Sequence, residues 1–264
     1  MALFGKRASS QPQSPPGPAP IDRLIRALGG NQKILDSVRS DAANDPQGLL
    51  RVAGAVLFDN VYQLTKDNRG ARIEDILAIL ASVGGHACIV GALDMHFKNG
   101  GKTSQSELTM LMGKDGIGYY FGDLPNRALL ESPESLLSMA LGAAQTRGGN
   151  VSLEKVHDVM RHVASTIGKP EFGVPRIVGD HRPGDLPVNY IKSFSPMLFK
   201  ALRAYEVPLN KCASAFGFAV YKAIAMVDKS LDPTIAADIV TECAVPAAKI
   251  DPARFRHFGE IMTP

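Results

Sequence analysis

The stretch ILAILASVGGHACIVGAL, residues 76–93, contains no Asp, Glu, Lys or Arg and is the longest such run in the chain. Projected at about 100° per residue, it shows no single apolar stripe, because apolar side chains surround it. A helix that is apolar all round is a buried helix. The large side chains gather on one side and the small residues on the other: Ile73, Ile76, Leu77, Leu80, Val83 and Val90, extended by Ile79, Ile89 and Leu93, against Ala78, Ala81, Gly84, Gly85, Cys88 and Ala92.

We therefore predict a central core helix over residues 72–97, whose small-residue side admits a second helix closely. Two adjacent glycines cost a helix about 1 kcal/mol each, so packing must hold it or it bends at Gly84-Gly85. The run is also long enough to span a membrane, which leaves membrane association through 76–93 as an alternative. His86 within the run and Asp94 and His96 at its end favour the core helix.

Composition limits the class of protein. The 264 residues are 45% hydrophobic and 21% charged, which is ordinary for a globular core. A net charge of +3 is too weak to indicate nucleic-acid binding. Three widely spaced cysteines fit buried, reduced thiols of a cytoplasmic protein, and the N-terminus lacks the apolar core of a signal peptide.

The rest of the chain predicts a mostly α-helical single domain over residues 21–264. A Pro- and Ser-rich N-terminal tail, residues 1–20, has no apolar pattern and is expected to be disordered. A capping residue followed by Pro marks several helix starts, since the missing N–H of Pro costs nothing there. These pairs are Asp45-Pro46, Ser132-Pro133, Ser195-Pro196, Asp232-Pro233 and Asp251-Pro252. The expected helices are 21–28, 31–40, 46–66, 72–97, 133–146, 153–167, 188–205, 208–229 and 233–244, with a last turn or two from 252.

One β-hairpin is expected near residues 107–123. Apolar runs flank Gly113-Lys114-Asp115-Gly116, and Asp-Gly is a strong hairpin signal. A lone hairpin is only marginally stable, so it must pack on the helices or pair with another chain. The second possibility would produce oligomers through a strand edge.

The sequence predicts no catalytic residues, no cofactor and no metal. The segment NGGKT, residues 99–103, lacks the first glycine of a phosphate-binding loop and reads as a polar turn after the central helix. The histidines lack the spacing that helical metal sites use. His86 is expected to be buried and hydrogen-bonded. No G-x-S-x-G nucleophile motif is present, and Cys212 at a helix start is expected to be buried.

Candidate ligand-binding residues lie mainly in the long loop 168–187. Long ordered loops in compact domains often carry function. An Asp beside a His can tune its pKa, and two Arg could hold a carboxylate or phosphate. The candidates are His86, His96, Arg176, Asp180, His181 and Arg182. An ordinary solvated connector is the competing interpretation.

The sequence favours a non-catalytic helical binding or scaffolding protein that acts through protein–protein contacts and self-association. This prediction rests on what the sequence lacks, because it contains neither a catalytic constellation at usable spacing nor a cofactor motif. An enzyme with a site built from the 168–187 loop is one alternative, and a peripheral membrane protein that uses the 76–93 helix is another. No substrate or small-molecule ligand is indicated, and nucleic acid is not expected as a partner.

Overall fold

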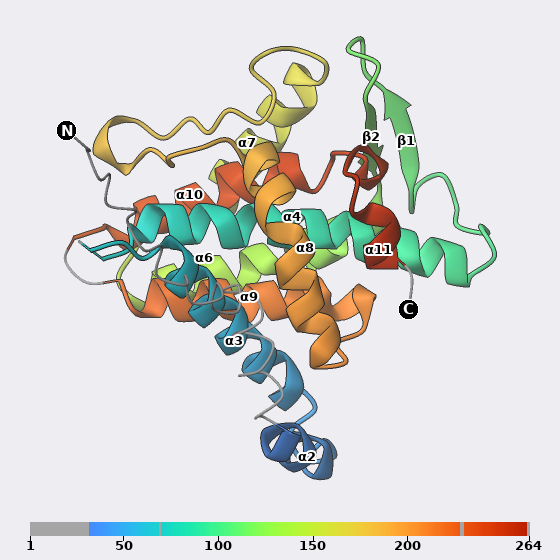
Figure 1. Ribbon diagram of the computed structural model, residues 1–264. Helices are drawn as coiled ribbons and strands as arrows, with labels where there is room; N and C mark the ends of the chain where they lie inside the picture. Colours follow the sequence, from blue (N-terminus) through green and yellow to red (C-terminus); the bar gives the residue numbers. More distant parts are fainter. Residues whose placement is uncertain (1–31, 69, 228–229, 263–264) are drawn as a thin grey trace, which may run out of the picture.

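The fold is mostly α-helical with one β-hairpin, as the sequence predicted (Figure 1). The computed structural model describes residues 32–68, 70–227 and 230–262. The expected disordered tail, residues 1–20, and the expected helix 21–28 lie outside the described residues. The longer elements are α2 (Gln32–Ser40), α3 (Gly48–Thr65), α4 (Ile73–Lys98), α6 (Leu136–Thr146), α7 (Leu153–Thr166), α8 (Pro187–Ala204), α9 (Cys212–Ala225) and α10 (Pro233–Ala247).

Short helical turns connect these elements. They are α5 (Asp123–Asn126), the π-helical turn η1 (Arg127–Glu131), the 3₁₀ turns η2 (Gly179–His181), η3 (Leu209–Lys211) and η4 (Pro252–Arg254), and α11 (Phe258–Met262). None of the first three was predicted, because segments of three to five residues are too short to show a period. The turn expected from 252 is present as η4, where Asp251 accepts a hydrogen bond from the Ala253 N–H at 2.9 Å.

The central helix α4 is the core of the molecule, as expected. It packs against α3, α8, α9 and α10, which surround it (Figure 1). Among the described residues it is the one helix long and apolar enough to cross a membrane, and its whole apolar stretch is buried by protein. The polar turn predicted after it is also present, with Gly100 and Gly101 at positive φ. Membrane association of this helix stays a prediction.

Glycines on α4 admit its neighbours closely. A Cβ placed on Gly85 would lie 2.3 Å from the carbonyl oxygen of Ala244 on α10, and one on Gly84 would lie 2.9 Å from Cβ of Phe216 on α9. A side chain at Gly85 would prevent the present approach of α10 to α4, and one at Gly84 would prevent that of α9. The small-residue side of α4 thus faces α10 and α9, and the expected packing of the second small-residue helix on α4 is confirmed.

Three of the predicted helix starts are misplaced. Asp45-Pro46 precedes α3 by two residues, and Gln47 stands at the N-cap position without a side-chain hydrogen bond. Ser195-Pro196 lies inside α8, which begins at Pro187, and burial of neighbouring side chains holds the helix across the hydrogen bond that Pro196 removes. Ser132-Pro133 precedes α6 by a turn, because the Ser135 side chain caps that helix by accepting from the Ser138 N–H. Asp232 does cap α10, accepting from the Thr234 N–H at 2.7 Å.

The hairpin pairs β1 (Thr109–Met112) with β2 (Gly118–Phe121) in antiparallel register around the predicted Asp115-Gly116 turn. It is anchored through β2, whose Tyr119 bridges to Ile250 after α10. The Tyr120 N–H donates to the Lys249 carbonyl at 2.7 Å, and the Asp251 N–H donates to the Gly118 carbonyl at 3.0 Å. β2 therefore lies between the chain after α10 and β1, and β1 is the outer strand (Figure 1).

Candidate functional site

The long loop, residues 168–187, does not bring its candidate residues together. Arg176 turns toward α10 and α7. Its Nε donates to Glu242 Oε1 at 2.9 Å and its Nη1 donates to Asp158 Oδ2 at 3.0 Å. His181 turns instead toward the start of α4, where its Nδ1 lies 2.9 Å from Glu74 Oε1. The two predicted site residues thus bind different helices.

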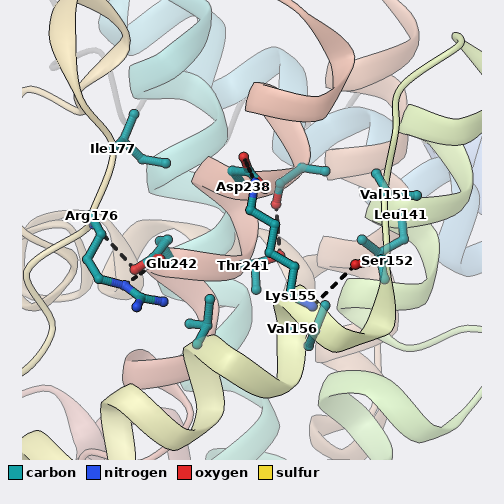
Figure 2. A pocket seen from close by; sticks show the side chains of 12 residues that line it. Leu141, Val151, Ser152, Lys155, Val156, Arg176, Ile177, Asp238, Thr241 and Glu242 are labelled. Carbon is teal, nitrogen blue, oxygen red and sulfur yellow. Dashed lines mark hydrogen bonds and ion pairs between the residues drawn. The ribbon is translucent and has the colours of Figure 1, made fainter.

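A small pocket lies beside Arg176, where the loop passes α7 and α10 (Figure 2). Lys155 pairs with Asp238 and Arg176 pairs with Glu242 across its walls. Its volume of about 100 Å³ has room for roughly three water molecules. Because each carboxylate already has its own cation, the arrangement ties α7 and the loop to α10.

The other half of the loop is fastened to the start of α4. The Arg72 side chain donates to the carbonyls of Asp180 and Arg182, at 2.9 and 3.2 Å. Asp75 Oδ1 accepts from the Gly184 N–H at 2.7 Å and from the Tyr190 hydroxyl at 3.1 Å. Burial, with the Asp75 carboxylate nearby, raises the pKa of Tyr190. The side chains of Asp180 and Arg182 are exposed, so this network uses their backbone rather than their charge.

His86 is buried, as expected, but the expected hydrogen bond is absent. Neither ring nitrogen has a partner among the described residues. The imidazole lies edge-on to Phe255, with ring centroids 5.0 Å apart, and to Phe199 at 6.3 Å. Aromatic rings rather than acceptors surround it, and burial followed by the nearby His257 lowers the pKa of His86 to about 3. A neutral, enclosed imidazole cannot meet a ligand from solution.

The last candidate, His96, lies near the C-terminal end of α4, away from the other five. His96 bonds through Nδ1 to the Thr103 hydroxyl just beyond α4. Cys212 begins α9, and its burial is confirmed by an exposed fraction of 1%. This burial raises the pKa of its thiol to about 12. Within residues 32–68, 70–227 and 230–262, no three His, Cys, Asp or Glu side chains gather as metal ligands would.

Lys249 is a buried charge that the sequence reasoning missed. Its Nζ donates to Asn126 Oδ1 at 3.0 Å and lies 5.2 Å from the centre of the Phe121 ring. Burial lowers the pKa of Lys249 to about 8. The sequence feature that could have indicated this burial is the position of Lys249, just after the apolar C-terminal end of α10. Its place under the hairpin, against α5 and β2, indicates a structural role.

The outer edge of β1 exposes large apolar side chains to solvent. Met110, Leu111 and Met112 are consecutive and expose 47, 52 and 65% of their areas. In the described part of the chain, β1 has no strand on its outer side. No charged residue or proline occurs from Leu108 to Gly113, whereas edge strands are usually blunted by such residues. We take this edge as the candidate interface.

Comparisons with known proteins identify no relative: no family model, no curated protein and no solved structure matches the chain.

Proposed function

We propose that this protein is a non-catalytic helical binding protein that holds other protein chains by strand addition at the free edge of β1. One observation carries the proposal: three consecutive large apolar side chains lie exposed on an unpaired strand edge. Main-chain hydrogen bonds supply affinity in this mode of recognition, and alternate side chains supply specificity. Burying those side chains removes apolar surface from water, which is the dominant favourable term in association.

The anchoring of the hairpin supports this use. β2 is fixed to the chain after α10 by backbone hydrogen bonds, and Tyr119 is buried at 2% exposure. The Tyr119 hydroxyl also donates to Asp115 Oδ2 in the turn, at 2.7 Å. A strand that is already ordered loses little conformational entropy when a second strand pairs with it. β1 is thus presented on a rigid support with its outer side open.

The alternative of an enzyme built on the 168–187 loop stays a prediction. Arg176 lines the small pocket beside α10, which His181 does not reach, and their charged partners are Glu242, Asp158 and Glu74. These ion pairs hold the two side chains against different helices, Arg176 against α7 and α10 and His181 against the start of α4. The proposal therefore places function at the hairpin rather than at the loop.

Photo-crosslinking in the cells that make the protein tests the proposal. A benzophenone-bearing residue is placed at Met112, and at Leu153 as a control, because Leu153 is exposed to a similar 56% at the start of α7. We expect a discrete covalent adduct from position 112 and none from 153. The adduct should disappear when Leu111→Lys is added, since a charge on the edge opposes strand pairing. An absent adduct, or one that survives Leu111→Lys, would overturn the proposal.

A further inference from the structure

The register of the hairpin fixes which backbone groups of β1 face outward. In an antiparallel pair, directly opposed residues alternate between hydrogen-bonded and non-hydrogen-bonded pairs. Gly113 donates its N–H to the Ile117 carbonyl at 2.8 Å, which makes that pair hydrogen-bonded. Counting along the ladder, Leu111 with Tyr119 is hydrogen-bonded, and Met110 with Tyr120 is not. The N–H and C=O of Met110 and Met112 therefore point away from β2.

Identical strands can pair antiparallel around a two-fold axis in few ways. An isologous interface brings the same surface of both copies together. In an antiparallel ladder such an axis passes through the centre of an opposed pair, so a residue must face its own copy. The axis can pass through a hydrogen-bonded or a non-hydrogen-bonded pair, so the residues from Leu108 to Met112 are all possible centres. Centring on Leu111 would pair Met110 with the partner's Met112, but it would bring Glu107 opposite the partner's Asp115, and like charges directly opposite are destabilising.

Together with the charge opposition that disfavours Leu111, the turns at both ends of β1 select Met110. Centring on Met112 would pair residue 114 with Met110, but residues 114–116 form the hairpin turn. Centring on Leu108 or Thr109 would use residues from 105–107, which form another turn, and the Leu108 N–H already donates to the Ser104 carbonyl at 3.1 Å. Centring on Met110 keeps every paired residue within the extended segment 108–112 and provides about four inter-chain hydrogen bonds.

The charges that flank the strand permit this register. With Met110 opposite its own copy, Glu107 falls opposite Gly113 and Lys114 falls opposite Ser106, so no like charges face each other. Like charges directly opposite would be destabilising. The partner's Lys114 neighbours Glu107, so the charges that meet at the rim are opposite in sign. Between these ends the strand is uncharged.

We infer that the occupant of the β1 edge is the β1 strand of a second copy of this chain, paired antiparallel with Met110 on the two-fold axis. This inference rests on the proposed function and names its partner. The result is a closed dimer whose two hairpins form one four-stranded sheet, β2–β1–β1–β2. Both copies use the same edge, so pairing leaves no free β1 edge for a third chain.

Disulfide trapping distinguishes the register. In the dimer, Met110→Cys faces its own copy, and hydrogen-bonded antiparallel pairs have Cα atoms about 5.5 Å apart, within disulfide reach. Met112→Cys is the matched control: it is more exposed than Met110, but its two copies are four positions apart, roughly 13 Å. The native Cys88, Cys212 and Cys243 are buried and do not compete. Under mild oxidation, we expect Met110→Cys to form a reducible dimer at least about tenfold faster than Met112→Cys.

Light scattering on the unmodified chain supplies a second measurement, independent of the substitutions. We expect a mass of twice 28.2 kDa that falls to the single-chain mass with Leu111→Lys. Equal trapping rates, or a mass above two chains, would overturn the paired register. A monomer whose Met112 adduct in cells contains a different protein would overturn the second copy as occupant and leave the proposed function standing. If the residue at position 112 forms no adduct even without Leu111→Lys, both the second copy as occupant and the proposed function are overturned.

Discussion

At the scale of single residues, His86 places a polar ring at the centre of an apolar helix, and no described residue hydrogen-bonds to either ring nitrogen. Its pKa is about 3 in the folded protein and 6.5 as an ordinary value, so between these pH values the unfolded chain binds a proton that the folded chain does not. Stability therefore falls as the pH drops below about 6.5, by up to about 1.4 kcal/mol per pH unit, and this contribution is fully present above pH 6.5.

His86→Leu should remove that share of the acid sensitivity. Between pH 7 and 4.5, the free energy of unfolding measured in urea should fall less steeply than in the unsubstituted protein. The difference in slope should approach that of one bound proton, about 1.4 kcal/mol per pH unit. At pH 7.5 the variant should be at least as stable, because it removes two buried nitrogens that have no partner in the part of the chain that the structure describes. His157→Leu, at an exposed position on α7, is the control. If both variants keep the original slope, the burial of His86 does not set it.

At the scale of elements, the contact of α4 with α10 depends on Gly85. A Cβ there would lie 2.3 Å from the Ala244 carbonyl oxygen and 2.9 Å from its Cα, and backbone atoms cannot turn aside as a flexible side chain can. Gly85→Ala should gain up to about 1 kcal/mol of helix propensity but force the two helices apart. We expect a net loss of about 2 kcal/mol in urea unfolding, since overpacking typically costs 1–3 kcal/mol.

Gly142 provides the matched control for Gly85. It lies inside α6 with no atom within 4 Å of a built Cβ. Gly142→Ala should therefore show the propensity term alone and stabilise the protein by roughly 0.5–1 kcal/mol. If Gly85→Ala stabilised the protein as much as Gly142→Ala, α4 and α10 would not be held at the distance that the structure shows.

Periodic apolar segments and capping residues predicted the described helices, usually to within two or three residues. The core helix was the clearest, because apolar residues on every side leave burial as the main outcome. The helix start predicted at Ser195-Pro196 was wrong, because a Ser-Pro pair has the same sequence at a helix start as inside a helix that packing stabilises. The turns from Asp123 to Glu131 were missed because their conformation depends on contacts with α4 and α6 rather than on local periodicity.

The candidate site was less predictable than the helices. Adjacency of Asp180, His181 and Arg182 suggested a shared site, but their contacts are set by Glu74 and Arg72, more than a hundred residues away in the chain. The hairpin was predictable from Asp115-Gly116, and its possible pairing with another chain from its isolation. That β1 rather than β2 has the free edge depends on the Tyr119 bridge to Ile250, which no local pattern encodes.

At the scale of the whole molecule, three clusters of buried side chains meet on α4, one of them formed by Ile89, Ala92 and Leu93 with Leu124. The main cluster of buried side chains runs from Leu35 on α2 to Ile261 on α11. A smaller cluster joins the hairpin to the C-terminal segment through Tyr119, Ile250 and Phe255. Phe255 also contacts the ring of His86 on α4, so the smaller cluster abuts the centre of the main one. The hairpin and the helices should consequently fold as one unit.

We therefore predict a single unfolding transition in urea. Far-UV circular dichroism reports the helices, whereas near-UV dichroism reports the tyrosines, since the chain has no Trp. Tyr119→Phe identifies the share of the near-UV signal that belongs to the hairpin. Because Phe255 bridges the two clusters, the Tyr119-dependent signal should be lost at the same urea concentration as the helical signal. Phe255→Ala should lower stability by about 3–5 kcal/mol but leave the transition single, because Leu108 and Tyr120 also pack on the end of α4. If the Tyr119 signal disappeared first in the unsubstituted protein, the hairpin would be a separate unit and the single-domain expectation would fail.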